Sequence, residues 1–168
     1  MNSEKQTLIL GVGNILLGDE GIGVHAIEYL KQFPLPPNVA LVDGGTGGFH
    51  LLSYFEDYSP IILIDATMDG NVDGTVRLLQ PKFASDFPKT LSAHDIGLRD
   101  LIETAALLST VPPVFLITVS ISEIQPMSVE LSPALRQALP NVVTSVLNIL
   151  INENRNPANA LYLQENQA

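Results

Sequence analysis

The chain has 168 residues, a formal net charge of −10 and no cysteine. Without cysteine it has no disulfide, thiol nucleophile or thiolate metal ligand, so any metal must be held by His, Asp, Glu or backbone oxygen. The negative charge disfavours non-specific nucleic-acid binding, and we expect no nucleic-acid partner. The length and composition predict a single domain over residues 1–151, followed by a polar tail over 152–168 that frays.

The N-terminal residues 1–6 are polar and mixed in charge, which makes a poor signal peptide. No continuous apolar run approaches the ~20 residues that span a bilayer, and we expect no membrane partner. We therefore expect a cytoplasmic protein, and we expect it to be a monomer.

Along the chain, strands are expected to alternate with helices. Short apolar runs predict buried strands over residues 8–10, 39–42, 61–64 and 114–119, with an edge strand over 76–79. Apolar residues at helical spacing predict helices over 22–33, 49–55, 96–108 and 133–151, the last of which restarts at Pro140. This alternation predicts a three-layer α/β/α sandwich around a mostly parallel, twisted sheet.

The first of these strands opens the stretch TLILGVGNILLGDEGIG, from Thr7 to Gly23. A strand, a glycine turn, a short loop and a helix form the opening half of a βαβ unit. Ligands of open α/β sheets bind beyond the carboxyl ends of the strands. We therefore expect a functional site at the loop that holds Asn14, Asp19 and Glu20.

A metal site is one interpretation of the polar residues at this edge. Glu20, Asp65 and His94 each lie near the end of a predicted strand or the start of a predicted helix. Two carboxylates and one imidazole suit a divalent ion such as Ni²⁺ or Zn²⁺, with positions left open for substrate. Separately, each has an ordinary alternative: Glu20 could favour a helix N-terminus, Asp65 could cap a turn, and His94 could be a surface residue.

Dinucleotide binding is a second interpretation, because Gly11 and Gly13 follow the first strand. The fingerprint requires a third glycine where this chain has Leu16. The acidic residue that ends the second strand, Asp43, also lies farther along the chain than the fingerprint requires. The match is partial, and a nucleotide-binding α/β enzyme remains an alternative.

Five sequence blocks, taken together and in order, resemble the nickel–iron hydrogenase maturation endopeptidases. They are Gly11-Val-Gly-Asn14, Gly18-Asp-Glu-Gly-Ile-Gly-Val24, Asp43-Gly-Gly-Thr-Gly47, Asp65-Ala66 and Ser92-Ala-His94-Asp-Ile-Gly97. The resemblance implies a phosphorylase-like or hydrolase-like α/β sandwich. It also implies cleavage of a C-terminal extension from the precursor of the hydrogenase large subunit after nickel insertion.

The same resemblance assigns roles to individual residues. The metal-binding acidic residues of the family fall on Glu20 and Asp65, and its histidine falls on His94. The family's glycine-rich motif falls on Asp43 to Thr46, and its aspartate is a candidate for substrate recognition or catalysis. We also expect Gly44, Gly45 and Thr46 to bind substrate, because glycines let a substrate backbone approach closely. We expect the nickel to be carried by the precursor and to act as the recognition signal.

Because the chain has no thiol and no recognisable serine nucleophile, we expect hydrolysis by an activated water. Either a metal polarises the carbonyl or lowers the pKa of the water, or Asp43 or Asp19 acts as general base. A non-catalytic metallochaperone that binds the precursor without cutting it remains a further alternative.

Other polar residues have simpler interpretations. His25 and Glu28 are expected to form a surface pair on the first helix. Asp69 and Asp73 lie in a turn-rich segment and are expected to be turn residues.

Overall fold

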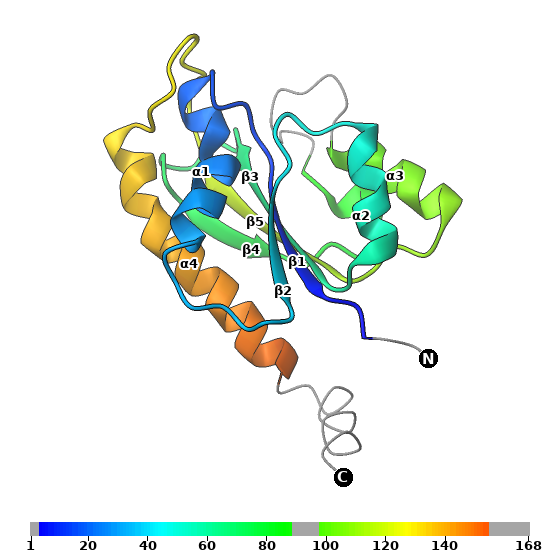
Figure 1. Cartoon of the computed structure of the whole chain (residues 1–168). Coiled ribbons are helices and arrows are strands. Elements are labelled where there is room, and N and C mark those ends of the chain that lie inside the picture. The colour runs from blue at the N-terminus through cyan, green and yellow to red at the C-terminus, as the bar shows by residue number, and fades with distance from the viewer. Residues whose placement is uncertain (1–3, 89–97, 155–168) are drawn as a thin grey trace.

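The computed structural model describes residues 4–88 and 98–154. Its five-stranded sheet has the order β2-β1-β3-β5-β4 (Figure 1). β4 runs antiparallel to β5, and the other neighbours pair in parallel. The strands are β1 (Thr7–Gly11), β2 (Val39–Asp43), β3 (Ile61–Thr67), β4 (Val76–Leu79) and β5 (Val114–Ser120).

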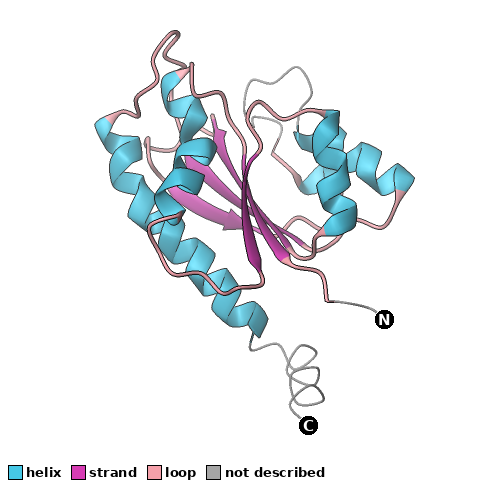
Figure 2. Cartoon of the chain, viewed as in Figure 1, coloured by secondary structure: helices cyan, strands magenta, loops and turns pink. Residues whose placement is uncertain are grey.

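Helices cover both faces of this sheet, which confirms the predicted three-layer α/β/α sandwich (Figure 2). One face is covered by α1 (Ile22–Leu30) and α4 (Pro133–Asn154), and the other by α2 (Leu52–Asp57) and α3 (Leu98–Leu108) (Figure 1). Short 3₁₀-helices precede α1 and α2 and follow β4: η1 (Gly18–Gly21), η2 (Phe49–Leu51) and η3 (Ala84–Asp86).

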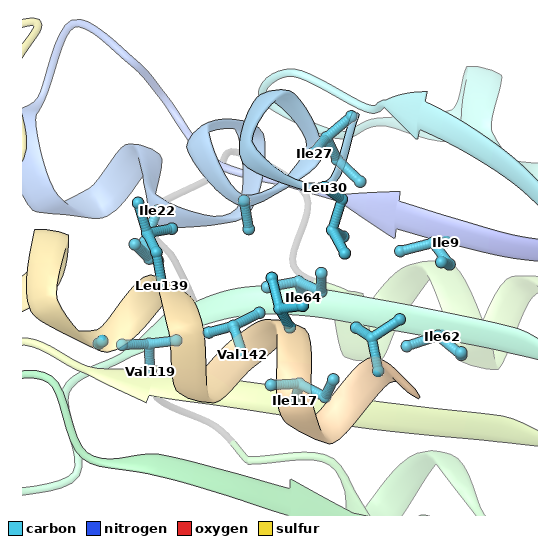
Figure 3. Packing of buried hydrophobic residues seen from close by; sticks show 14 of the residues in the cluster. Ile9, Ile22, Ile27, Leu30, Ile62, Ile64, Ile117, Val119, Leu139 and Val142 are labelled. Carbon is cyan, nitrogen blue, oxygen red and sulfur yellow. The ribbon is translucent and has the colours of Figure 1, made fainter. Parts of the chain in front are cut away.

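The strand side chains alternate between two cores, one on each face of the sheet. Ile62 and Ile64 of β3 belong to the core under α1 and α4, whereas Ile61 and Leu63 belong to the core under α2 and α3. Figure 3 shows Val142 of α4 lying over the first of these cores. Burial on both faces explains why the central strands are continuous apolar runs.

The prediction that Pro140 restarts the last helix is wrong, because α4 continues through it to Asn154. A proline inside a helix lacks one N–H donor and costs about 3 kcal/mol. The buried side chains on either side of it, including Leu139 and Val142, offset that cost.

The length and composition of α4 would also suit a membrane span, with 22 residues and a mean hydropathy of 1.2. It is the one helix of the described residues with this property. Its apolar residues, however, form much of the core under the sheet. Packing against the sheet therefore accounts for the hydropathy of α4.

Two predictions about burial are also wrong. β2 is an edge strand whose side chains are half-buried or exposed, not a buried strand, because β1 pairs with it on one side only. Leu108, expected on the buried face of α3, is exposed at the last residue of that helix. The periodicity of apolar residues identifies which face of a helix is buried. It does not show where along the helix that burial ends.

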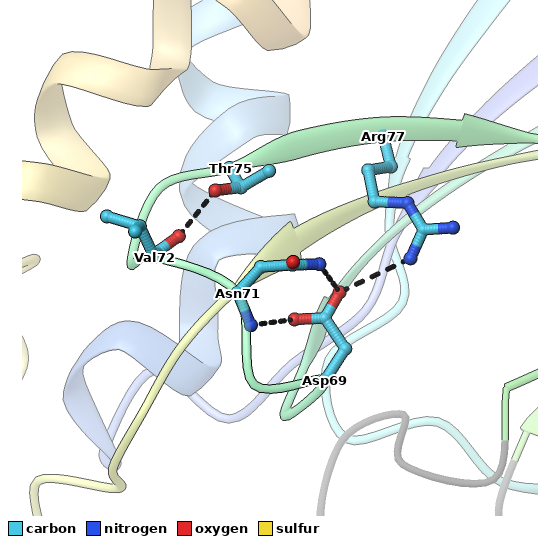
Figure 4. Close-up of polar contacts among 5 residues, drawn as sticks. All are labelled: Asp69, Asn71, Val72, Thr75 and Arg77. Carbon is cyan, nitrogen blue, oxygen red and sulfur yellow. Dashed lines mark hydrogen bonds and ion pairs between the residues drawn. The ribbon is translucent and has the colours of Figure 1, made fainter.

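The turn between β3 and β4 is built around Asp69, as predicted (Figure 4). Its carboxylate accepts hydrogen bonds from the backbone N–H of Asn71 at 3.1 Å and from its side-chain amide at 2.8 Å. Arg77 lies 3.5 Å away as an ion-pair partner. Burial acts to raise the pKa of Asp69, but the hydrogen bonds outweigh burial and hold that pKa below its usual value. Asp73 also lies in a turn, where it accepts a hydrogen bond from Ser122, so both turn predictions are confirmed.

Candidate functional site

The candidate site lies where β1 and β3 meet the start of α1, at the carboxyl edge of the sheet (Figure 1). Gly23, in the first turn of α1, packs directly on these two strands. A Cβ at Gly23 would overlap the carbonyl oxygens of Val12 and Ile64, and one at Gly11 would overlap the carbonyl of Gly23. The glycines of the opening motif therefore allow the helix to begin in contact with the strand ends.

Glu20 is buried in η1, within this close-packed turn. Its Oε2 accepts a hydrogen bond from the backbone N–H of Asn14 at 2.6 Å. Gly13, with φ of +153°, passes so close to the backbone of Glu20 that any side chain there would overlap its carbonyl. The hydrogen bond from Asn14 thus holds the Glu20 carboxylate against the backbone of the turn.

Asp65 is fully buried in β3, one residue beyond Ile64. Its Oδ1 accepts a hydrogen bond from the Ala66 N–H at 2.8 Å, and the Ile64 carbonyl accepts one from Val12 at 3.0 Å. Because η1 contacts β3, the elements that carry Glu20 and Asp65 meet at the same edge. A buried carboxylate is costly unless hydrogen bonds or a cation compensate it, so two of them at one edge suit the binding of a metal ion.

The third predicted ligand, His94, lies outside the described residues. Within residues 4–88 and 98–154, no group of three His, Asp or Glu side chains is arranged to hold a metal. Glu20 and Asp65 are therefore the described part of the predicted metal site.

Asp19 is buried beside Glu20, but its carboxylate faces the segment between β5 and α4. Oδ1 accepts a hydrogen bond from the Ser132 N–H at 2.7 Å, just before α4 begins, and Oδ2 accepts one from Gln125 Nε2 at 3.0 Å. The Asp19 N–H in turn donates to Gln125 Oε1 at 2.9 Å. Because this carboxylate is buried and both of its oxygens accept hydrogen bonds from the segment before α4, the geometry favours a positioning role for Asp19.

Asp43 has a different environment, exposed at the end of β2. Its Oδ1 accepts a hydrogen bond from the Gly45 N–H at 2.7 Å, which closes a tight turn. Gly45 has φ of +53°, and nothing lies within 4 Å of the position of its absent Cβ. Thr46 is exposed as well. Gly44, also predicted to bind substrate, is instead buried against Leu10 and Val12. The accessible parts of this segment are therefore the Asp43 carboxylate and the backbone from Gly45 onward.

The two segments are joined by backbone hydrogen bonds. The Gly44 N–H donates to the Gly11 carbonyl at 2.8 Å, and the Gly13 N–H donates to the Gly45 carbonyl at 2.8 Å. The Asp43 segment therefore lies directly against the turn that carries Glu20.

His25 does not form the predicted surface pair with Glu28, which instead pairs with Lys31 at 2.6 Å. The His25 side chain is half-buried and forms a hydrogen bond with the backbone of Val129. Burial lowers the pKa of the imidazole, although the Val129 bond and the nearby Asp19 carboxylate act to raise it. Helical spacing identified the position of His25 but not the segment that folds over it.

A surface cavity of about 630 Å³ lies elsewhere, between η3, the end of α3 and the segment that leads into β5. Its lining includes Phe83, Phe87 and Ile102, and the described residues among it contain no Asp, Glu or His. It reaches the first residue of β5, Val114, and so lies toward the opposite edge of the sheet from Glu20 and Asp65. This cavity is therefore distinct from the candidate site.

Comparison with known proteins identifies the family. A family model described as hydrogenase maturation protease (HycI) matches residues 24–149, a range that contains Asp43 and Asp65. The chain belongs to the hydrogenase maturation protease family.

Relatives in the family align beyond the range of that model. The hydrogenase 2 maturation protease of Escherichia coli K12 is 33% identical over 146 residues, which cover 85% of this chain and 89% of that protein. The solved structure of the hydrogenase maturating endopeptidase HybD from E. coli has a TM-score of 0.79 and 32% identity. That match covers 88% of this chain and 93% of HybD, so the family fold extends over most of the chain.

A longer relative is matched only in part. The hydrogenase expression/formation protein HupD of Bradyrhizobium diazoefficiens is 36% identical over 116 residues, which cover 66% of this chain. The chain spans only 59% of the length of that curated relative.

The segment that holds Gln125, Ser128 and Ser132 was missed by sequence reasoning. It lies more than 100 residues from Asp19 in the chain. It carries no recognisable motif, and its link to Asp19 depends on how β5 and α4 are placed by the whole sheet. No sequence signal could have identified it.

Proposed function

We propose that this protein is an endopeptidase that removes the C-terminal extension from the precursor of a nickel–iron hydrogenase large subunit after nickel insertion. Membership of the hydrogenase maturation protease family supports the reaction class. The observation that carries the proposal is the burial of Glu20 and Asp65 on two contacting elements at the carboxyl edge of the sheet.

In this proposal Glu20, Asp65 and His94 complete the coordination of nickel that the precursor already carries. Carboxylate oxygen and imidazole nitrogen are suitable ligands for this ion. A set of three protein ligands leaves positions for the ligands of the precursor. The nickel is then part of the substrate, and its presence tells the enzyme that the precursor is ready for cleavage.

The exposed segment after β2 supports the hydrolytic part of the proposal. Asp43 is the described carboxylate that is both accessible and adjacent to the turn of Glu20, so it is the preferred general base. Gly45, which faces open space, and the exposed Thr46 lie where an extended substrate chain can approach, whereas the buried Gly44 only supports this turn. Asp19 is assigned the positioning role that its hydrogen bonds favour, and the nickel polarises the scissile carbonyl if it lies close enough.

The test is cleavage of a nickel-loaded and a nickel-free precursor, followed by the mass of the large subunit. The wild type is expected to shorten the nickel-loaded precursor alone. Glu20→Gln, Asp65→Asn and His94→Ala are each expected to abolish cleavage. Gln and Asn keep an oxygen that can accept the hydrogen bonds from Asn14 and Ala66, so the fold should survive.

Glu56→Gln, at an exposed position on α2, is the matched control and should cleave normally. Normal cleavage by all three site variants would overturn the site assignment. Binding of the precursor by the wild type without any cleavage would instead indicate a metallochaperone. A thermal shift with NAD or a nucleoside, and none with Ni²⁺, would favour the nucleotide-binding alternative.

We also propose that the protein acts as a cytoplasmic monomer without a membrane or nucleic-acid partner. The net charge of −10 supports the absence of a nucleic-acid partner. Sedimentation of the purified chain should give one species of about monomer mass, and fractionation should leave it with the cytoplasmic proteins.

A further inference from the structure

Two loops at the carboxyl edge of the sheet lie side by side and form one surface feature, the two-loop ridge, made of residues 14–18 and 122–131. Ser128 joins them: its carbonyl accepts a hydrogen bond from the Gly18 N–H at 2.7 Å, and its N–H donates to the Leu16 carbonyl at 3.2 Å. In Figure 1 the second loop, yellow, lies beside the start of α1. Asp19, directly after the first loop, also forms two hydrogen bonds with Gln125 of the second loop.

The ridge carries four exposed apolar side chains: Ile15, Leu16, Met127 and Val129. Met127 is 96% exposed and Leu16 is 58% exposed. Met127 also has φ of +59°, and it is the one residue other than glycine with a positive φ in the part of the chain that the structure describes. This conformation is unfavourable for a residue with a Cβ.

Met127 lies in a turn directly after Pro126, which accounts for the positive φ but not for a large apolar side chain at this position. A methionine side chain in water contributes no packing, and a glycine would adopt the same backbone conformation without strain. An exposed, unbranched thioether side chain is well suited to an adaptable protein contact. The ridge therefore has the properties of a surface that is covered by a partner.

The position of the ridge indicates which partner covers it. Gly18, which is hydrogen-bonded to Ser128, directly precedes Asp19 and Glu20, so the ridge is continuous with the candidate site. A folded protein whose C-terminus reaches that site must contact the rim around it. Four side chains present at most a few hundred Å², less than the about 800 Å² per partner of a stable dimer, and this suits a transient enzyme–substrate encounter.

The charge of the ridge argues against a lipid surface. Residues 14–18 and 122–131 contain no Lys or Arg, and Glu123 and Glu130 are exposed beside the apolar side chains. Attraction to anionic membranes requires basic residues.

We propose that the two-loop ridge is the docking surface for the folded body of the precursor, and that it holds the precursor while the C-terminal extension enters the site. This rests on the proposed function for the identity of the partner. Ile15, Leu16, Met127 and Val129 pack against an apolar patch of the precursor. The affinity for the whole precursor therefore depends on residues that do not touch the scissile bond.

The test uses Leu16→Gln, Met127→Gln and the double variant, with Leu107→Gln as the matched control. Leu107 is 88% exposed on α3, on the opposite face of the sheet. Glutamine removes apolar character at similar length, and at residue 127 it keeps the backbone strain. Each single ridge variant is expected to raise the Kd of the nickel-loaded precursor about fivefold, and the double variant more. The control should bind like the wild type.

Cleavage separates docking from catalysis. The ridge variants should lower kcat/KM by about the same factor, while kcat at saturating precursor stays near that of the wild type. Met127→Gly adds a second check, because it should weaken binding without lowering the melting temperature. Ridge variants that keep the wild-type fold and bind the precursor like the wild type would overturn the proposal, even if the wild type cleaves normally.

The failure of the proposed function is distinguishable from this result. If the wild type binds the precursor but never cleaves it, the proposed peptidase activity is wrong. The binding measurements on the ridge variants then still test the docking proposal. Two further results would overturn the proposal: binding to phosphatidylserine vesicles that Met127→Gln abolishes, and a dimer in solution that Leu16→Gln dissociates.

Discussion

Two glycine-rich segments at the same edge of the sheet differ in how their glycines are used. In the β1–α1 turn, residues 11–23, backbone from other residues occupies the space where side chains of Gly11, Gly13 and Gly23 would lie. After β2, by contrast, Gly45 faces open space and has φ of +53°. Glycine therefore permits close packing at Gly11, Gly13 and Gly23 and an accessible, unusual backbone at Gly45, although Gly44 in the second segment is itself packed against Leu10 and Val12.

The carboxylates of the two segments follow the same division. Asp19 and Glu20 are buried and held by hydrogen bonds, whereas Asp43 is exposed. We interpret the first segment as a rigid holder for metal-binding and positioning groups. The second is interpreted as the part of the site that the substrate chain reaches.

The largest expected effect breaks the packing of the first segment. Gly23→Ala should reduce the free energy of unfolding by more than about 3 kcal/mol, because the new Cβ overlaps two backbone carbonyls that cannot move aside. Helix propensity alone would make alanine better than glycine there by about 1 kcal/mol, so a loss has to be steric.

Gly45→Ala is the matched substitution in the second segment. Its Cβ meets nothing, and only the positive φ costs about 1 kcal/mol. Urea unfolding of both variants measures the difference. Equal losses would contradict the contrast between a packed and an open segment.

The next effect separates the two aspartates. Asp19→Asn should cost about 2 kcal/mol, because an amide group cannot accept hydrogen bonds on both sides from Ser132 and Gln125. Asp43→Asn should leave stability nearly unchanged but abolish cleavage of the precursor. Denaturant unfolding and a cleavage assay on both variants make the test. A loss of stability in Asp43→Asn together with a loss of cleavage alone in Asp19→Asn would contradict the roles that we assign to these residues.

The smallest effect is a pH dependence of stability that arises from His25. Burial lowers its pKa in the folded state below the value of 6.5 in the unfolded chain, so the folded protein binds fewer protons. Above pH 6.5, the titration of His25 does not reduce the free energy of unfolding. As the pH falls from 6.5 toward the folded pKa, protonation of the unfolded chain lowers the free energy of unfolding. His25→Gln should therefore make stability less sensitive to pH between 7 and 5.

Urea unfolding at a series of pH values checks this expectation, with His50→Gln as an exposed control. If His25→Gln leaves the pH dependence of stability unchanged, titratable groups other than His25 cause that dependence.

The sequence predicted the sandwich well because its signals are local. The apolar runs of β1, β3 and β5 reflect burial on both faces, and the glycines after β1 and β2 mark real backbone constraints. The sequence misplaced features set by neighbours far along the chain. The half-burial of β2 depends on strand order, and the continuation of α4 through Pro140 depends on the core beneath it.

The candidate site shows the same limit. Motif residues led to Glu20 and Asp65, because both follow apolar strands at one edge of the sheet. The roles of Asp19 and His25 could not be predicted from the sequence. Both depend on residues 122–132, which only the tertiary fold brings close to them. Motifs thus identified the groups suited to chemistry but not the contacts that hold them.

The most direct test of the account is the nickel dependence of precursor binding. The Kd of nickel-loaded and nickel-free precursor is measured for the wild type and for the variant that combines Glu20→Gln and Asp65→Asn. The account predicts that nickel tightens binding to the wild type at least about tenfold and has no effect on the variant. An equal nickel effect on both proteins would contradict the assignment of these carboxylates to the metal.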